Sequence, residues 1–268
     1  MFLARLLVLF SLVCISCAHS SFEQKQLKHA LDFATSNRLE LEILLQHYTY
    51  DSLKLEAAKF LIRNMPHCYS YQQGGEMDSV KRVRTYYSPF GQIDQTYARR
   101  WGHYTYRNLP KIYDAHIITA EYLIDNIDRA FDNWQKRPWN RSLSFEDFCE
   151  YLLPYRIGDE PLEEWRELYE KKYGYLLDSI YKGSDVVEAA NLVSRHLQEP
   201  VFIYCEDFEL PHIGPRYLFS HRYGSCVDAA DIVTYAFRAV GIPCMEDTDA
   251  RGGHVWNVVR DTTGRDVP

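Results

Sequence analysis

The sequence predicts an α+β protein, in which a mainly helical region over residues 22–199 precedes a region of one helix and short strands over residues 200–268. In the first region apolar residues recur at helical spacing between prolines. After Pro200 a strand-like apolar run, Val201–Tyr204, and an irregular connection lead into one amphipathic helix. Hydrophobic residues make up 46% of the 268 residues, so we expect a packed core, in one large domain or two smaller ones.

Capping residues indicate where helices begin in the first region. A polar residue before a helical run accepts hydrogen bonds from the first backbone N–H groups, and an acid three residues later completes a capping box. Such starts are predicted at Asn37 with Glu40, Asp51 or Ser52, Ser144 with Asp147, Pro161 with Glu163, and Asp185 with Glu188. Another amphipathic helix is expected over Thr119–Trp134, and a long loop over Gln72–Arg100.

Several polar clusters have two interpretations each. In one interpretation, a substrate cleft is lined by the segments Tyr155–Glu160 and Trp165–Arg166. In the other, an arginine in these segments packs on aromatic rings and pairs with an acid. Two interpretations are likewise open for a tyrosine-rich run: it binds a sugar or peptide, or it forms an amphipathic packing surface. The run consists of Tyr86, Tyr87, Tyr97, Tyr104 and Tyr106. His212 and His221 are predicted to be loop residues rather than metal ligands.

The N-terminus has the pattern of a signal peptide over residues 1–17. Arg5 precedes the apolar run Leu6–Ile15, which is too short to span a membrane. Ser16-Cys17-Ala18 is an ordinary secretory cleavage pattern, whereas Cys14-Ile15-Ser16-Cys17 resembles a lipobox with Cys17 as the lipidated residue. Both predict a secreted or cell-envelope protein, held at a membrane only through a lipid anchor at Cys17.

Charge and cysteine content exclude other classes. A formal net charge of −7 argues against a nucleic-acid partner, which needs clustered lysine and arginine. Removal of the signal leaves Cys68, Cys149, Cys205, Cys226 and Cys244, an odd number, so at least one thiol stays unpaired or pairs between chains. None of these shows Cys-x-x-Cys spacing, and neither a metal nor a cofactor is expected.

Cys226 begins the strongest helical pattern of the chain. Small or apolar residues share one face of this helix, and Gly241 with Pro243 marks its end. The N–H groups and partial positive charge of a helix start favour thiolate over thiol and can stabilise an oxyanion. A cysteine on the apolar face of a helix is more often a plain core residue, which is the interpretation given to Cys244.

His254 is predicted to begin a strand after Gly252 and Gly253. Strand alternation places His254, Trp256 and Val258 on one face. A histidine at a strand start beside a cysteine at a helix start is what a thiolate–imidazolium pair requires.

Three linked motifs carry a resemblance to a known family. Gly224-Ser225-Cys226, the helix end Arg238–Pro243, and Gly253-His254-Val255-Trp256-Asn257 resemble, in order and spacing, the core of the transglutaminase-like superfamily of papain-related thiol enzymes. The stretches Leu53–Leu61 and Tyr151–Arg156 are similar to the helical region of its bacterial lipoprotein members. The resemblance implies a papain-like core with a helix packed on an antiparallel sheet.

The resemblance also implies site residues and an activity. Cys226 would be the nucleophile, His254 the base and Trp256 a wall of the site, with an acid on the next strand to orient the histidine. Asp266 comes too early for that acid, so we expect the acid just past Pro268 and an incomplete core. The implied activity is hydrolysis of a peptide or amide bond in a protein or peptide substrate. The alternative is a non-catalytic module that binds a peptide or glycan on a degenerate scaffold.

Overall fold

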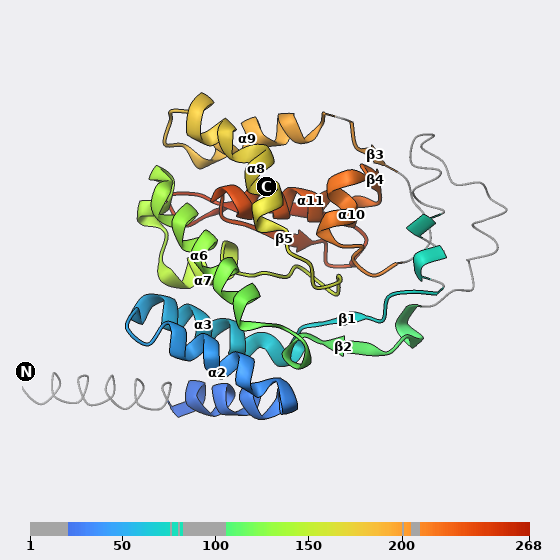
Figure 1. Ribbon diagram of the computed structural model, residues 1–268. Helices are drawn as coiled ribbons and strands as arrows, with labels where there is room; N and C mark the ends of the chain where they lie inside the picture. The colour runs from blue at the N-terminus through green and yellow to red at the C-terminus, as the bar shows by residue number, and fades with distance from the viewer. Residues whose placement is uncertain (1–20, 76, 80, 83–105, 200, 205–209) are drawn as a thin grey trace, which may run out of the picture. The chain divides into compact units, whose positions relative to one another are not determined.

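The computed structural model describes residues 21–268, apart from residues 76, 80, 83–105, 200 and 205–209 (Figure 1). The fold is mixed α+β, with small sheets and a larger share of helix. Contacts divide the chain into two compact units. Unit 1 comprises residues 1–68 and 113–120, and unit 2 comprises residues 69–112 and 121–268.

Unit 1 contains helical residues 21–33, α2 (Arg38–His47) and α3 (Ser52–Asn64). Asp51 caps α3 as predicted, since its carboxylate accepts from the backbone N–H of Lys54 at 3.1 Å. Asn37 is the N-cap residue of α2, as predicted, but its side chain makes no cap hydrogen bond, so the capping box predicted with Glu40 is wrong. Asn37 donates its amide to distant carbonyls of residues 115 and 118, and Glu40 accepts from the N–H of Ala120.

Unit 2 contains most of the helices. They are α6 (Ala120–Lys136), α7 (Phe145–Tyr151), α8 (Arg166–Tyr175) with a π-helical continuation Leu176–Ile180, α9 (Val186–Leu197), α10 (Pro215–Ser220) and α11 (Cys226–Val240). Ser144 and Asp185 are N-caps as predicted. The helix predicted from Pro161 begins only at Arg166, because the Glu163 carboxylate instead accepts the N–H of Arg216.

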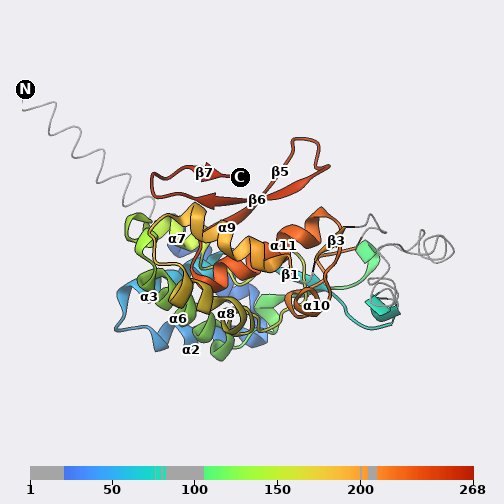
Figure 2. The same ribbon diagram turned by 90° about the horizontal axis from the view of Figure 1, so that it is seen from above.

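The strands form three small sheets. β1 (Tyr69–Tyr71) pairs with β2 (Lys111–Tyr113), and β3 (Ile203–Tyr204) pairs in parallel with β4 (Tyr223–Gly224). The third sheet has the antiparallel order β5 (Cys244–Thr248), β6 (Val255–Arg260) and β7 (Asp266–Val267). Seen from above, this sheet lies along one side of α11 (Figure 2).

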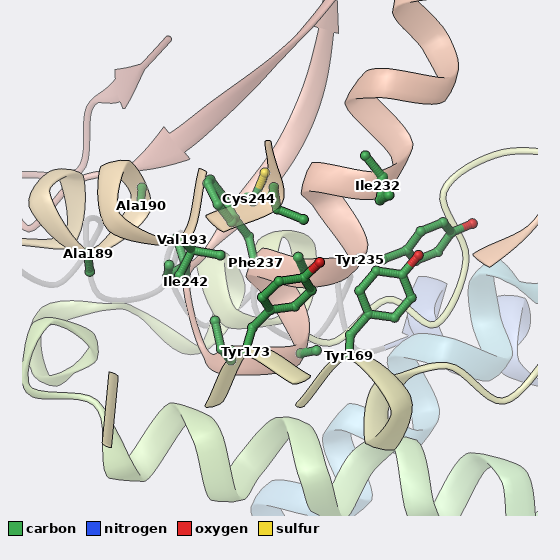
Figure 3. Packing of buried hydrophobic residues seen from close by; sticks show 14 of the residues in the cluster. Tyr169, Tyr173, Ala189, Ala190, Val193, Ile232, Tyr235, Phe237, Ile242 and Cys244 are labelled. Atoms are coloured by element: carbon green, nitrogen blue, oxygen red, sulfur yellow. The ribbon is translucent and has the colours of Figure 1, made fainter. Parts of the chain in front are cut away.

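Helix α11 is central to the main hydrophobic core of unit 2. Tyr169 of α8 and Tyr235 of α11 are fully buried, with ring centroids 5.7 Å apart, and Trp165 lies 5.0 Å from Tyr235. Side chains of α9 and the start of β5 converge on the same cluster (Figure 3). The helix is therefore held on several sides at once, which fixes where its first residue lies.

The end of α11 is anchored by a buried segment that starts in α6. Gly241 has φ 83°, the left-handed conformation that favours glycine after a helix. The carbonyl oxygens of residues 239, 240 and 241 accept side-chain hydrogen bonds of 2.8–3.1 Å. The donors are Asn133 to Ala239, Arg137 to Val240, and Trp139 and Asn140 to Gly241. This anchor explains why glycine stands at this point of the sequence.

Substitution Gly241→Ala is expected to lower the free energy of unfolding by at least about 2 kcal/mol. An added Cβ would be 2.8 Å from both the Arg137 Cγ and the backbone oxygen of Asn133, and the left-handed φ adds strain. The measurement is urea unfolding followed by tryptophan fluorescence. The control is Gly253→Ala, where an added Cβ comes no closer than 3.5 Å to its nearest neighbour, Asp249. Equal stability of the two variants would contradict the prediction.

Candidate active site at the start of helix α11

Cys226 is the first residue of α11, as the sequence predicts, and its thiol is free and half-buried. Ser225 before it is the N-cap, in an extended conformation. A Cβ on Gly224 would lie 2.3 Å from the Asp228 carboxylate, so a glycine is needed two residues before the cysteine. The Gly-Ser-Cys sequence thus has a local steric reason.

Asp228 closes the start of the helix. One of its carboxylate oxygens accepts from the backbone N–H of Ser225 at 2.9 Å and lies 3.1 Å from the Ser225 hydroxyl. The sequence interpretation missed this role, although Ser225 and Asp228 have the spacing of a capping box. The cap fixes the first turn, and so the position of Cys226.

Contacts between α11 and β6 show that the two elements run in the same direction. The Asn257 amide donates to the carbonyl of Ala230 at 3.0 Å and to the Thr234 hydroxyl at 2.8 Å, in the first and middle parts of the helix. Further along, the N–H of Arg260 donates to the carbonyl of Pro243, beyond the end of the helix. His254, which immediately precedes β6, therefore lies toward the end of α11 that carries Cys226.

His254 does not contact Cys226 through a hydrogen bond in this structure. Its side chain is exposed, and its ring lies 6.0 Å from that of Trp256. Because Asn257 faces α11, strand alternation places His254 and Trp256 on the opposite face of β6. The structure thus brings the two predicted residues to one end of the helix but does not form the pair.

Asp266 does not orient His254. It pairs with Arg260 across β6 and β7, and its carboxylate accepts from the Tyr151 hydroxyl at 2.9 Å and from Arg260 at 3.1 Å. In this antiparallel pairing Asp266 lies opposite Arg260, which is six residues after His254. If the pairing continued, the residue opposite His254 would be six residues after Asp266, past Pro268. The geometry agrees with the expectation that Asp266 is too early.

A buried polar cluster lies beside this site, and the sequence interpretation missed it. The His212 Nδ1 is 2.9 Å from both carboxylate oxygens of Asp231, which is fully buried on α11. Glu246 of β5 accepts from the Thr234 hydroxyl at 3.2 Å and interacts electrostatically with Asp231, one turn earlier on α11. We call His212, Asp231, Thr234 and Glu246 the acid cluster. His212 was expected to be an ordinary loop residue.

Electrostatics in the acid cluster keep protons on two of its groups. Burial tends to lower the pKa of His212, but attraction to and hydrogen bonding with Asp231 prevail and raise that pKa to about 10. Burial, with the nearby Asp231, raises the pKa of Glu246 to about 9. At neutral pH His212 is therefore charged and Glu246 is neutral.

Trp165 and Arg166 line part of a surface pocket together with Tyr122, Asn126 and Arg216, whereas Tyr155–Glu160 does not contribute to that pocket. Tyr155, Trp165 and Arg166 are buried. Arg156 packs inside and pairs with Glu160, as the packing interpretation predicts, while Arg166 stacks on Trp165 but binds carbonyl oxygens rather than an acid. Cys244 is fully buried, and burial raises its pKa to about 12, consistent with a core thiol.

Other sequence-based assignments fall partly or wholly outside the description. The signal peptide with Cys17, Cys205 and the tyrosines at 86, 87, 97 and 104 all lie outside the described residues. Within the described residues, no group of three or more His, Cys, Asp or Glu side chains is arranged to hold a metal ion. None of the helices described is long and apolar enough to cross a membrane.

No known family, curated protein or solved structure gave a significant match to this chain. The resemblance to the transglutaminase-like superfamily therefore depends on the three sequence motifs, of which one lies at each end of α11 and the third at the start of β6.

Proposed function

We propose that this protein is a thiol-dependent acyl-transfer enzyme that hydrolyses peptide or amide bonds at the cell envelope, with Cys226 as nucleophile and His254 as base. The observation that supports this most is the half-buried free thiol at the first residue of a firmly anchored helix. The start of β6, with its histidine, lies toward the same end of that helix.

The proposed chemistry needs one proton carrier and one oxyanion site. The Cys226 sulfur attacks the amide carbonyl carbon, a C–S bond forms, and N–H groups of the helix start hold the oxyanion. The C–N bond then breaks, and the leaving amine takes the proton held by His254. Water then attacks the thioester carbonyl carbon and gives a proton to His254, the C–S bond breaks, and the carboxylic acid product leaves as the Cys226 thiolate is restored.

The exposed position of His254 sets a condition on this chemistry. Its ring must turn from the Trp256 side of β6 to the α11 side when substrate binds. Gly252, with φ 68°, and Gly253 precede it, and the turn they form is held by the Asp249 carboxylate. The rearrangement is confined to this glycine-containing turn.

Alkylation by iodoacetamide, read peptide by peptide by mass spectrometry, tests the proposal on the full chain. Cys226 is expected to react at least about tenfold faster than a small reference thiol at about pH 6, because only a poised thiolate remains nucleophilic there. His254→Ala should abolish the excess, whereas His29→Ala, at an exposed helical position, should not. Cys244 in the same sample serves as the buried, unreactive thiol.

Two outcomes would overturn the proposal. One is labelling of Cys226 at the reference rate, unaffected by His254→Ala. The other is full amidase activity in Cys226→Ala. Either result would favour the binding-module alternative. Two observations favour that alternative in this structure: Cys226 and His254 share no hydrogen bond, and Asp266 is engaged by Tyr151 and Arg260.

A further inference from the structure

We propose that Glu246 is a positioning residue that ties the β5–β6 hairpin to α11 through its carboxyl group, which binds Thr234 and lies in one buried cluster with Asp231. The hairpin carries His254 and the helix carries Cys226, so the proposal rests on the proposed function for its catalytic consequence. Its structural part can be tested independently.

Several polar contacts between hairpin and helix lie in this cluster. Glu246 and Asn257 are directly opposite each other on β5 and β6. Asn257 donates to Ala230 and Thr234, while Glu246 accepts from Thr234, one turn along α11 from Asp231. Both side chains of this cross-strand pair therefore reach the same two turns of α11.

Counting donors and acceptors shows where a proton is needed. The Thr234 oxygen accepts from Asn257, so its own hydrogen is available for the Glu246 Oε1 at 3.2 Å. Asp231 accepts from the His212 Nδ1 and so acts as the ionised partner. A second ionised carboxylate one helical turn from Asp231 would be repelled by it, so we place the proton of this cluster on Glu246, which binds Thr234 rather than His212. Burial and Asp231 raise the pKa of Glu246 in agreement with this count.

The surroundings oppose a second negative charge. The titratable groups that interact with Glu246, Asp231 and His212 come from α11, β5, the loop before α8 and the segment before α10. They are Asp228, Asp231, Tyr235 and Arg238 on α11, Cys244 on β5, Glu160 in the loop, and His212. Three of these are acids and only His212 and Arg238 are cations, so ionisation of Glu246 would add to an acidic excess and weaken the contact with α11.

Hydrogen exchange of the backbone amides of β5 and β6, corrected for intrinsic rates, tests the structural part between about pH 7 and pH 10. Protection in the native chain is expected to fall at least about tenfold as pH passes about 9. In Glu246→Gln protection should persist, because the glutamine carbonyl accepts from Thr234, as the protonated acid does, and the side chain stays uncharged. In Glu246→Ala protection should be low throughout. Asp247→Asn, at an exposed position of the same strand, should match the native chain.

Cys226 alkylation in the same samples separates the two proposals. If Glu246→Gln extends both protection and Cys226 reactivity to higher pH, both proposals stand. If protection behaves as expected but Cys226 is unreactive throughout, the positioning contact stands and the proposed enzyme fails. Equal protection of the native chain and Glu246→Gln across the whole pH range would overturn the role of Glu246.

Discussion

Replacement of Arg166 by methionine is expected to lower the free energy of unfolding by about 3–5 kcal/mol. Arg166 is the first residue of α8 and is 4% exposed. Its guanidinium donates to buried oxygens on three sides of the core. The acceptors are the Asn126 side chain and the carbonyls of Leu152, Leu153, Pro154 and Arg238.

The size of this effect follows from what the substitution leaves behind. Methionine fills a similar volume but donates nothing, so buried carbonyls lose their partner and are not reached by water. Arg166→Lys should recover only part of the loss, because one ammonium cannot reproduce the planar fork of donors. Residues 152–154 and residue 238 would also lose the guanidinium that joins them through hydrogen bonds.

Urea unfolding with the matched control Lys171→Met tests this expectation. Lys171 is on the same helix, its side chain is 72% exposed, and it pairs only with Glu167 at the surface. Its removal should change stability by less than about 0.5 kcal/mol. A loss below about 1 kcal/mol in Arg166→Met would show that these hydrogen bonds do not hold the core together.

Stability is expected to fall as pH rises from about 6.5 to about 9, by at least about 1 kcal/mol per pH unit. His212 has a pKa of about 10 in the folded chain against an ordinary value of 6.5. Its contribution is therefore complete below pH 6.5 and is lost as pH rises through about 10. Glu246 has a pKa of about 9 against an ordinary 4.5, so the folded state keeps a proton that the unfolded state has released. Both groups make the folded state the better proton binder in this window, and each such proton gives a slope of about 1.4 kcal/mol per pH unit.

Chemical unfolding at a series of pH values measures this slope. Glu246→Gln should reduce it by about half, because only His212 then binds an extra proton in the folded state. Asp247→Asn should leave it unchanged. A stability that is flat or rises between about pH 6.5 and 9 would show that the acid cluster does not hold its protons as described.

The local features of this fold were largely predictable from the sequence. Asp51, Ser144 and Asp185 cap helices where their patterns indicate, because an N-cap hydrogen bond joins residues only two or three positions apart. The same holds for α11, which begins at Cys226 and ends before Gly241. The capping box predicted at Asn37 did not form, because the Asn37 side chain instead donates hydrogen bonds to the distant carbonyls of Ala115 and Ile118 in unit 1.

The sequence alone thus determined the α+β class, the main helix starts, and the placement of Cys226 at the start of a helix and of His254 at the start of a strand. Only the tertiary structure decided that His254 lies on the face of β6 away from α11, and that the acid cluster forms between α11 and the β5–β6 hairpin. The physical reason is distance along the chain. His212, Asp231 and Glu246 are brought together by the packing of a loop, a helix and a strand, and no local pattern encodes which side chains meet across those surfaces.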